Sequence, residues 1–157
     1  MKLRNVTASN HSKEFLVVTR GGREYAFPFS RTVPAPTAAD ALKDVFVDKE
    51  LASEGFTYTL RSGAQGSVHI EQVLEYNEDP GYLADLLTYR LSLEARRRLA
   101  TSDLSRRHVA KRLGTSVPQL YRLIDPSNTT KSMKQLIALL HVLGCNVDVV
   151  VRPHDAA

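Results

Sequence analysis

The sequence predicts an α+β protein in which a small antiparallel β-sheet domain, residues 1–79, is followed by a helical bundle, residues 80–157. Three observations lead to this prediction. Apolar runs separated by glycine-containing turns fill the first half, a turn-forming stretch (NEDPG) lies at residues 77–81, and apolar residues then recur at helical spacing. A chain of 157 residues has the length of one domain or two small ones, which excludes large two-domain enzymes.

Strands are predicted from short apolar runs in the first half. Residues 14–19 (EFLVVT) and 23–29 (REYAFPF) flank a Gly-Gly pair, which is typical of a tight hairpin turn. Residues 56–60 (FTYTL) alternate apolar and polar side chains, as a half-buried strand does. A glycine-containing turn then leads into a strand at residues 67–70, which the apolar pair at 73–74 would extend. We therefore expect one antiparallel sheet of about four strands.

A long helix is predicted to begin the second half. Asp79 is placed to cap it, and Pro80 suits its first turn because the missing N–H has no helical partner there. From residue 82 to about residue 99, apolar side chains recur every four positions, at Leu83, Leu87, Leu91 and Ala95.

Three shorter helices are predicted after it, with ranges 106–113, 117–124 and 133–143. Each follows a serine, a favoured N-cap residue: Ser105, Ser116 and Ser132. Gly114 stops the first of them, because glycine readily adopts the left-handed conformation that ends a helix. Two short helices joined by a tight turn with glycine define a helix-turn-helix.

A short C-terminal strand is predicted at residues 147–151 (VDVVV), which are mostly β-branched. Because an unpaired strand is prone to unwanted pairing, we expect it to join the N-terminal sheet or a second subunit.

The formal net charge of +4 conceals an uneven distribution. Residues 40–80 hold three basic and nine acidic side chains, a net charge of −6, whereas residues 88–134 hold eleven basic and three acidic ones, a net charge of +8. This asymmetry indicates separate tasks for the two halves. The hydrophobic fraction of 43% excludes a disordered chain, and no stretch approaches the roughly 18 apolar residues of a membrane span. A polar N-terminus and the lone Cys145 predict a cytoplasmic protein without a disulfide.

The segment LSRRHVAKRLGTSVPQLYRLI resembles the DNA-binding core of the Cro/lambda-repressor-like (Xre) helix-turn-helix family. Ala110 stands where the two helices of the family cross, and Gly114 stands at its turn. The apolar positions of the family pattern are filled by Val109, Leu113, Leu120 and Leu123. Thr115 departs from the pattern, since the family usually has a branched apolar residue there. The resemblance covers residues 104–143.

This resemblance implies binding of double-stranded DNA, with the second helix in the major groove. The residues that it places against base edges are Val117, Pro118, Gln119, Tyr121 and Arg122. The candidates for phosphate contact are Arg106, Arg107, Lys111, Arg112, Ser127, Asn128, Thr129, Thr130, Lys131 and Lys134. Several have a plainer interpretation: Val117 and Pro118 as surface apolar residues, Tyr121 packed on the loop at 125–128, and Lys111 and Arg112 as solvated charges. A homodimer would place two recognition helices about 34 Å apart, one turn of DNA.

The expected function is therefore that of a sequence-specific transcriptional regulator. An antitoxin that represses its own operon is one form that such a regulator can take. Residues 47–77 also resemble small β-rich domains of unassigned function found with such modules. The alternative is a protein-interaction module, either toxin-neutralising or a scaffold, whose helix-turn-helix does not bind DNA and whose acidic half binds a basic protein. An enzyme is not expected, since no paired-carboxylate motif, metal-ligand cluster or activated nucleophile is evident, and neither a cofactor nor a metal is predicted. A pocket joining Tyr25, His69 and Glu71 would favour an enzyme instead.

Overall fold

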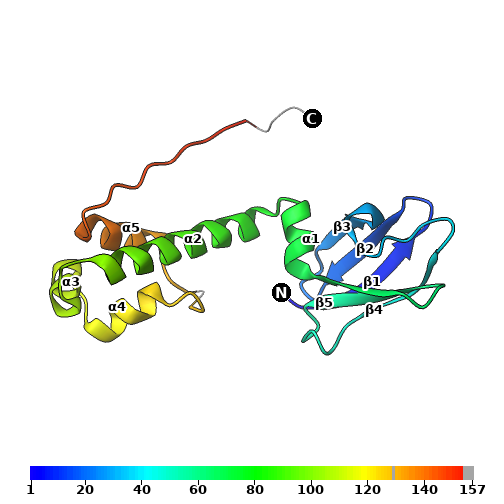
Figure 1. Cartoon of the computed structure of the whole chain (residues 1–157), viewed down its shortest axis with the longest axis horizontal. Coiled ribbons are helices and arrows are strands. Elements are labelled where there is room, and N and C mark those ends of the chain that lie inside the picture. The colour runs from blue at the N-terminus through cyan, green and yellow to red at the C-terminus, as the bar shows by residue number, and fades with distance from the viewer. Residues whose placement is uncertain (129, 154–157) are drawn as a thin grey trace. The chain divides into compact units, whose positions relative to one another are not determined.

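The computed structural model describes residues 1–128 and 130–153, and it confirms the α+β class (Figure 1). In chain order its strands and α-helices are β1 (Leu3–Ser9), β2 (Glu14–Thr19), β3 (Glu24–Pro28), β4 (Leu42–Val47), β5 (Gly55–Leu60), β6 (Gln65–His69), α1 (Ile70–Tyr76), α2 (Pro80–Thr101), α3 (Arg106–Leu113), α4 (Val117–Ile124) and α5 (Met133–Val142). The chain divides into two units, Met1–Leu83 (unit 1) and Ala84–Ala157 (unit 2), so α2 begins in the first and continues in the second.

Unit 1 holds two three-stranded antiparallel sheets, β1-β2-β3 and β4-β5-β6, so the expectation of one sheet of about four strands is wrong. The hairpin at the Gly-Gly pair is confirmed, because β2 pairs with β3 and Gly22 has φ +83°. Strand β1 gave no period-two signal in the sequence. Its buried residues Leu3 and Val6 are three positions apart, because the register with β2 shifts between Leu3 and Asn5.

Helix α1 shows that the prediction of a strand continuing through Val73 and Leu74 is wrong. The Nδ1 of His69 accepts a hydrogen bond from the N–H of Glu71 at 3.4 Å, and Gln72 Oε1 accepts one from the N–H of His69 at 2.9 Å. This reciprocal capping box starts a helix at Ile70. Ile70, Val73 and Leu74 then bury one helical face in the core of unit 1.

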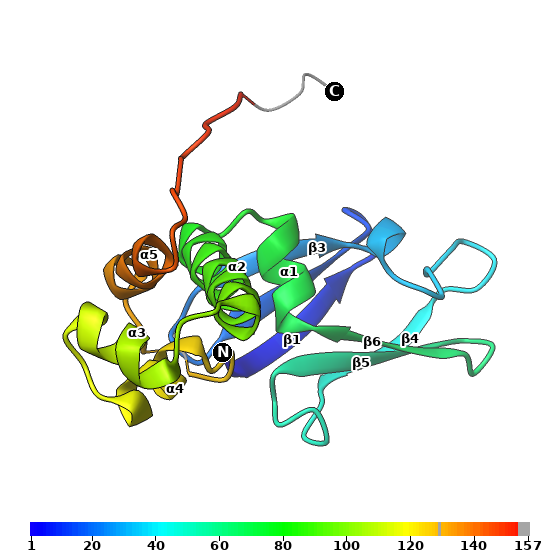
Figure 2. The same cartoon turned by 60° about the vertical axis from the view of Figure 1, so that its left-hand side comes forward.

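Aromatic side chains from both sheets form the centre of that core. The ring of Phe15 on β2 lies 4.7 Å from the ring of Phe29, 4.9 Å from that of Phe56 and 5.4 Å from that of Tyr58, measured between centroids. Such tilted pairs stabilise a core beyond the area they bury. The buried Tyr58 hydroxyl donates to the carbonyl of Pro34 at 2.7 Å. Figure 2 shows α1 lying beside β3 at the side of this unit.

The cap predicted at Asp79 is confirmed and has a second role. Asp79 Oδ1 accepts from the N–H of Tyr82 in the first turn of α2 at 3.0 Å. Its Oδ2 accepts from the Tyr25 hydroxyl at 2.9 Å and from Arg23 Nη1 at 3.1 Å. The bonds from Tyr82 and Tyr25 hold the pKa of this buried carboxyl below its ordinary value. One carboxylate therefore fixes the start of α2 against β3.

Unit 2 is helical, and its helices share one apolar core. The buried residues of this core are Ala95 and Leu99 on α2, Val109 and Ala110 on α3, Leu120 and Leu123 on α4, and Leu136, Leu139 and Leu140 on α5. Figures 1 and 2 show α3, α4 and α5 gathered around the C-terminal part of α2. Among the residues described, none of the helices combines the length and the apolarity that crossing a membrane would need.

The C-terminal strand predicted at residues 147–151 is not formed. The described residues from 146 onward are extended but unpaired, and Figure 1 shows them as a trace that leaves the end of α5. Val147 is half-buried against the core of unit 2, whereas Val149, Val150 and Val151 are 86%, 71% and 88% exposed. Both sheets lie in unit 1 and neither includes this segment, so within the described residues it has no strand partner.

Candidate nucleic-acid interface

A tight joint between α3 and α4 positions the candidate interface. The Ser105 hydroxyl caps α3 by accepting from the N–H of His108, and the Ser116 hydroxyl caps α4 by accepting from the N–H of Gln119. Between them Gly114 has φ +73° and ψ +33°, in the left-handed region. The N–H of Thr115 donates back to the carbonyl of Ala110 at 2.9 Å, which closes the turn. The caps and the stop predicted from the sequence are confirmed here.

Burial fixes which face of α4 points outward. Leu120 is completely buried and Leu123 is 7% exposed, both in the core with Val109 and Ala110 of α3. A residue as small as Ala110 at a contact between helices allows their backbones to approach closely. Because Leu120 and Leu123 hold one face of α4 in the core, the opposite face lies in solvent.

Four of the five candidates for base contact lie on that outer face. Pro118, Gln119 and Arg122 are exposed, and Tyr121 is 51% exposed. Val117 differs, since it is half-buried and packs against the core of unit 2. The outer face therefore presents one amide, one phenol and one guanidinium, all of which can form hydrogen bonds with base edges or phosphates.

The basic candidates divide into two groups by their contacts. Arg106 Nη1 donates to the carbonyl of Leu99 at 2.8 Å, and Lys131 Nζ donates to the carbonyl of Asp125 at 2.5 Å, so both are engaged within the chain. The others are exposed, and across residues 1–128 and 130–153 their side chains make neither an ion pair nor a hydrogen bond: Arg107, Lys111, Arg112, Arg122 and Lys134. These five cations remain available to an external anion.

The loop between α4 and α5 is organised by its own side chains. Asp125 Oδ1 accepts from both the N–H and the hydroxyl of Ser127, which keep the pKa of this carboxyl low. Asn128 Oδ1 accepts in the same way from Thr130, and its amide donates to the carbonyl of Arg122 at 3.1 Å. Three of the four predicted loop contacts thus lie in an ordered turn next to α4, while Thr129 lies outside the described residues.

The first turns of the three short helices in unit 2 are electropositive, a feature that was not used to choose the candidate residues. Helices α3, α4 and α5 have no acidic residue in the first turn, where acidic residues are usually favoured by the helix dipole. Arg106, Arg107 and Lys134 stand in the first turns of α3 and α5 instead. The combination of a positive helix end with added cations attracts anions. The sequence already indicates this feature, because no Asp or Glu follows the serine caps in the first turn of these helices.

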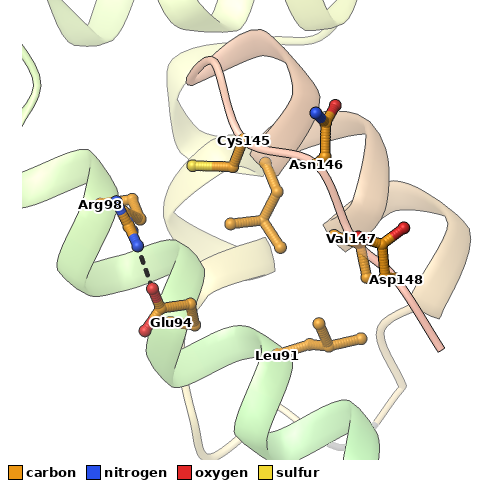
Figure 3. Close-up of a pocket in the computed structure, with 8 residues that line it drawn as sticks. Leu91, Glu94, Arg98, Cys145, Asn146, Val147 and Asp148 are labelled. Atoms are coloured by element: carbon orange, nitrogen blue, oxygen red, sulfur yellow. Dashed lines mark hydrogen bonds and ion pairs between the residues drawn. The ribbon is translucent and has the colours of Figure 1, made fainter. Parts of the chain in front are cut away.

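The pocket shown in Figure 3 lies elsewhere in unit 2, between α2 and the chain after α5. It has a volume of about 260 Å³, and its wall carries Glu94, Arg98 and Cys145. Glu94 bonds to both Arg97 and Arg98, and these guanidiniums lower its pKa to about 2. A carboxylate held ionised in this way is poorly suited to exchange protons near neutral pH. Within the described residues no cluster of His, Cys, Asp or Glu could hold a metal ion.

No protein-family model matches the chain, and no curated protein sequence matches it either.

Proposed function

We propose that the chain is a transcriptional regulator that binds double-stranded DNA through α3 and α4, acting as a helix-turn-helix. The observation that carries the proposal is the division of α4 into two faces. Leu120 and Leu123 anchor one face in the core, while the exposed side chains of Gln119, Tyr121 and Arg122 lie on the other. A recognition helix needs this arrangement, because base contacts require side chains that are not committed to the fold.

The surrounding charge supports this proposal. The five free cations named above come from α3, α4 and the first turn of α5, which all contribute to one core. Phosphate contacts of this kind provide affinity and set the register of a protein on DNA, whereas base contacts provide sequence preference. We assign Arg122 and Gln119 to base contact, and Arg107 and Lys134 to phosphate contact.

The rival interpretation, in which the acidic half binds a basic protein, loses part of its basis. Among the nine acidic residues at 40–80, at least four use their carboxylates within the chain. Asp40 accepts from Ser62, Asp48 from Thr57, Glu54 from the N-terminal amine, and Asp79 from Tyr25. Glu54 and Asp79 pair with cations, the N-terminal amine and Arg23, so two of the nine negative charges are offset within the chain. The hydroxyl donors leave the charges of Asp40 and Asp48 in place.

The test begins with selection of DNA by the full-length protein from a library of random duplexes. The proposal predicts an enriched sequence. Fluorescence anisotropy then measures the affinity of each variant for the selected duplex and for a scrambled one. Arg122→Ala should weaken binding to the selected duplex by about 1–3 kcal/mol, or about 5- to 150-fold, and should reduce the preference over the scrambled duplex.

Lys134→Ala should weaken binding to both duplexes alike and reduce the slope of log affinity against log salt by about one. Lys49→Ala is the matched control, because Lys49 is an exposed cation in unit 1 and should leave both affinities unchanged. Equal, uniform losses from Arg122→Ala and Lys134→Ala would show that Arg122 contacts only phosphate. Failure to enrich any sequence would refute the proposed regulator.

A further inference from the structure

The segment after α5 is the feature that the structure leaves unexplained. Its residues 147–153 read VDVVVRP, and the three consecutive valines at 149–151 are between 71% and 88% exposed. Figure 1 shows it as an extended trace, and among the residues that the structure describes it belongs to neither sheet, so its backbone N–H and C=O groups have no ladder partner there. Exposed β-branched residues on an unpaired extended chain favour pairing with another strand.

We infer that this segment pairs with the same segment of a second copy of the chain, as a two-stranded antiparallel ribbon centred on Val150. Antiparallel pairing of identical segments generates a two-fold axis, which closes the assembly at a dimer. The inference does not depend on DNA binding, because it concerns only the segment and its copy.

The charges of the segment select the register. With Val150 opposite Val150 of the second copy, Val149 lies opposite Val151, and Asp148 lies opposite Arg152. This ion pair occurs twice, once on each side of the two-fold axis. Centring the ribbon on Asp148 would place two like charges opposite each other, and centring it on Val149 would leave Asp148 opposite a valine. Cross-strand pairs of opposite charge and of β-branched residues stabilise a ribbon, and like charges destabilise it.

The side chains of the proposed ribbon alternate between two faces, and one of these faces is continuous with the core of unit 2. Alternation puts Val147, Val149 and Val151 on one face, and Asp148, Val150 and Arg152 on the other. Val147 already packs against the core of unit 2, so the valine face continues from the bundle. The ion pairs then lie on the opposite face. Pro153 follows Arg152 and lacks an N–H, so it suits the end of the ribbon.

The first experiment measures oligomeric state by light scattering coupled to size exclusion, across the micromolar range and without DNA. We expect a dimer for the unmodified chain. Val150→Asp should yield a monomer, because it puts two carboxylates directly opposite each other at the two-fold axis. Val33→Asp is the matched control, since Val33 is 91% exposed in unit 1, and it should remain dimeric. A monomeric unmodified chain, or a dimeric Val150→Asp variant, would overturn the inference.

The second experiment tests the register by exchange of charges. Asp148→Arg and Arg152→Asp each replace both ion pairs by like-charge pairs, and each should weaken dimerisation by about tenfold. The double variant restores opposite charges in the proposed register and should recover the dimer. A double variant as weak as either single one would overturn the register.

Cross-linking gives an independent readout that does not need a destabilised variant. In a Cys145→Ser background, Val150→Cys should oxidise rapidly to a disulfide-linked dimer, because directly opposed residues have Cα atoms about 4.5–5.5 Å apart. Val149→Cys should cross-link much more slowly, since residue 149 and its copy are diagonal neighbours about 7–8 Å apart. Equal rates for the two variants would contradict pairing about Val150.

Discussion

Asp79 offers a quantitative test of how the start of α2 is held. Replacement by alanine removes the acceptor of the Tyr82 N–H, and loss of a helix cap costs about 1 kcal/mol. It also leaves the Tyr25 hydroxyl, on a residue 8% exposed, without an acceptor, which costs about 1–3 kcal/mol. The ion pair with Arg23 adds little, because that guanidinium side chain is 63% exposed. We expect Asp79→Ala to lower the free energy of unfolding by about 2–4 kcal/mol.

Asp79→Asn is the matched control. Asparagine is as good an N-cap as aspartate, and its carbonyl oxygen can still accept from Tyr82, so the expected loss is about 1 kcal/mol. The measurement is equilibrium unfolding in urea followed by far-ultraviolet circular dichroism. A loss below about 0.5 kcal/mol for Asp79→Ala, within the range of ordinary surface substitutions, would refute this role for the carboxylate. An asparagine variant as unstable as the alanine variant would show that charge matters more than the cap.

The difference in stability between the wild-type protein and the Asp79→Asn variant should depend on pH, because it reflects the pKa of Asp79 in the folded wild-type protein. The pKa of Asp79 in the folded chain lies below its ordinary value of 3.8, so its carboxylate stabilises the fold fully above that value. The contribution is lost as the pH falls through the folded pKa. The difference in stability between the wild-type protein and the asparagine variant should therefore be constant near neutral pH and shrink below about pH 4. A difference that grows on acidification would contradict the assigned hydrogen bonds.

Two further substitutions test close packing and backbone conformation, with urea unfolding as the measurement. Gly66→Ala should destabilise the fold by about 1–3 kcal/mol, because a Cβ would overlap the ring and hydroxyl of the buried Tyr58; Gly21→Ala, whose nearest contact would be 3.9 Å away, should be nearly neutral. Gly114→Ala should cost about 1 kcal/mol from its positive φ alone, since its Cβ would meet nothing within 4 Å. A neutral Gly114→Ala would mean that the turn between α3 and α4 is not fixed in this conformation.

The helical half could be predicted well because its signals are local. Ser105, Ser116 and Ser132 each cap a helix as expected, and Gly114 ends α3 in the left-handed conformation. A cap depends on residues three or four apart, so the information lies within one short window. The apolar repeat of α2 was less informative: Leu87 is 53% exposed although it continues the pattern of Leu91 and Ala95.

The strands were harder to predict because pairing depends on distant residues. The bulge in β1 hid its alternation, and only the partner strand explains why Leu3 and Val6 are both buried. Helix α1 was a different failure, since the spacing of Ile70, Val73 and Leu74 and the His69–Gln72 capping pair were readable. The valines at 147–151 were read as a strand from propensity alone, and propensity does not supply a partner.

The candidate interface could be outlined from the sequence but not resolved into roles. The family resemblance placed Gln119, Tyr121 and Arg122 at outward positions of the second helix, and in the structure these residues are exposed on α4. It could not show that Arg106 and Lys131 donate to carbonyls of the chain, because those bonds join residues in different local elements. Only the three-dimensional contacts separate cations used by the fold from cations that remain free.

The central claim, recognition of a DNA sequence by α4, is tested most directly by the ratio of affinities for a selected duplex and a scrambled duplex, measured over a series of salt concentrations. If α4 reads a DNA sequence, the ratio should be at least about 10³, and the affinity for either duplex should fall steeply as salt rises. Equal affinities for the two duplexes, or an affinity that does not change with salt, would contradict it.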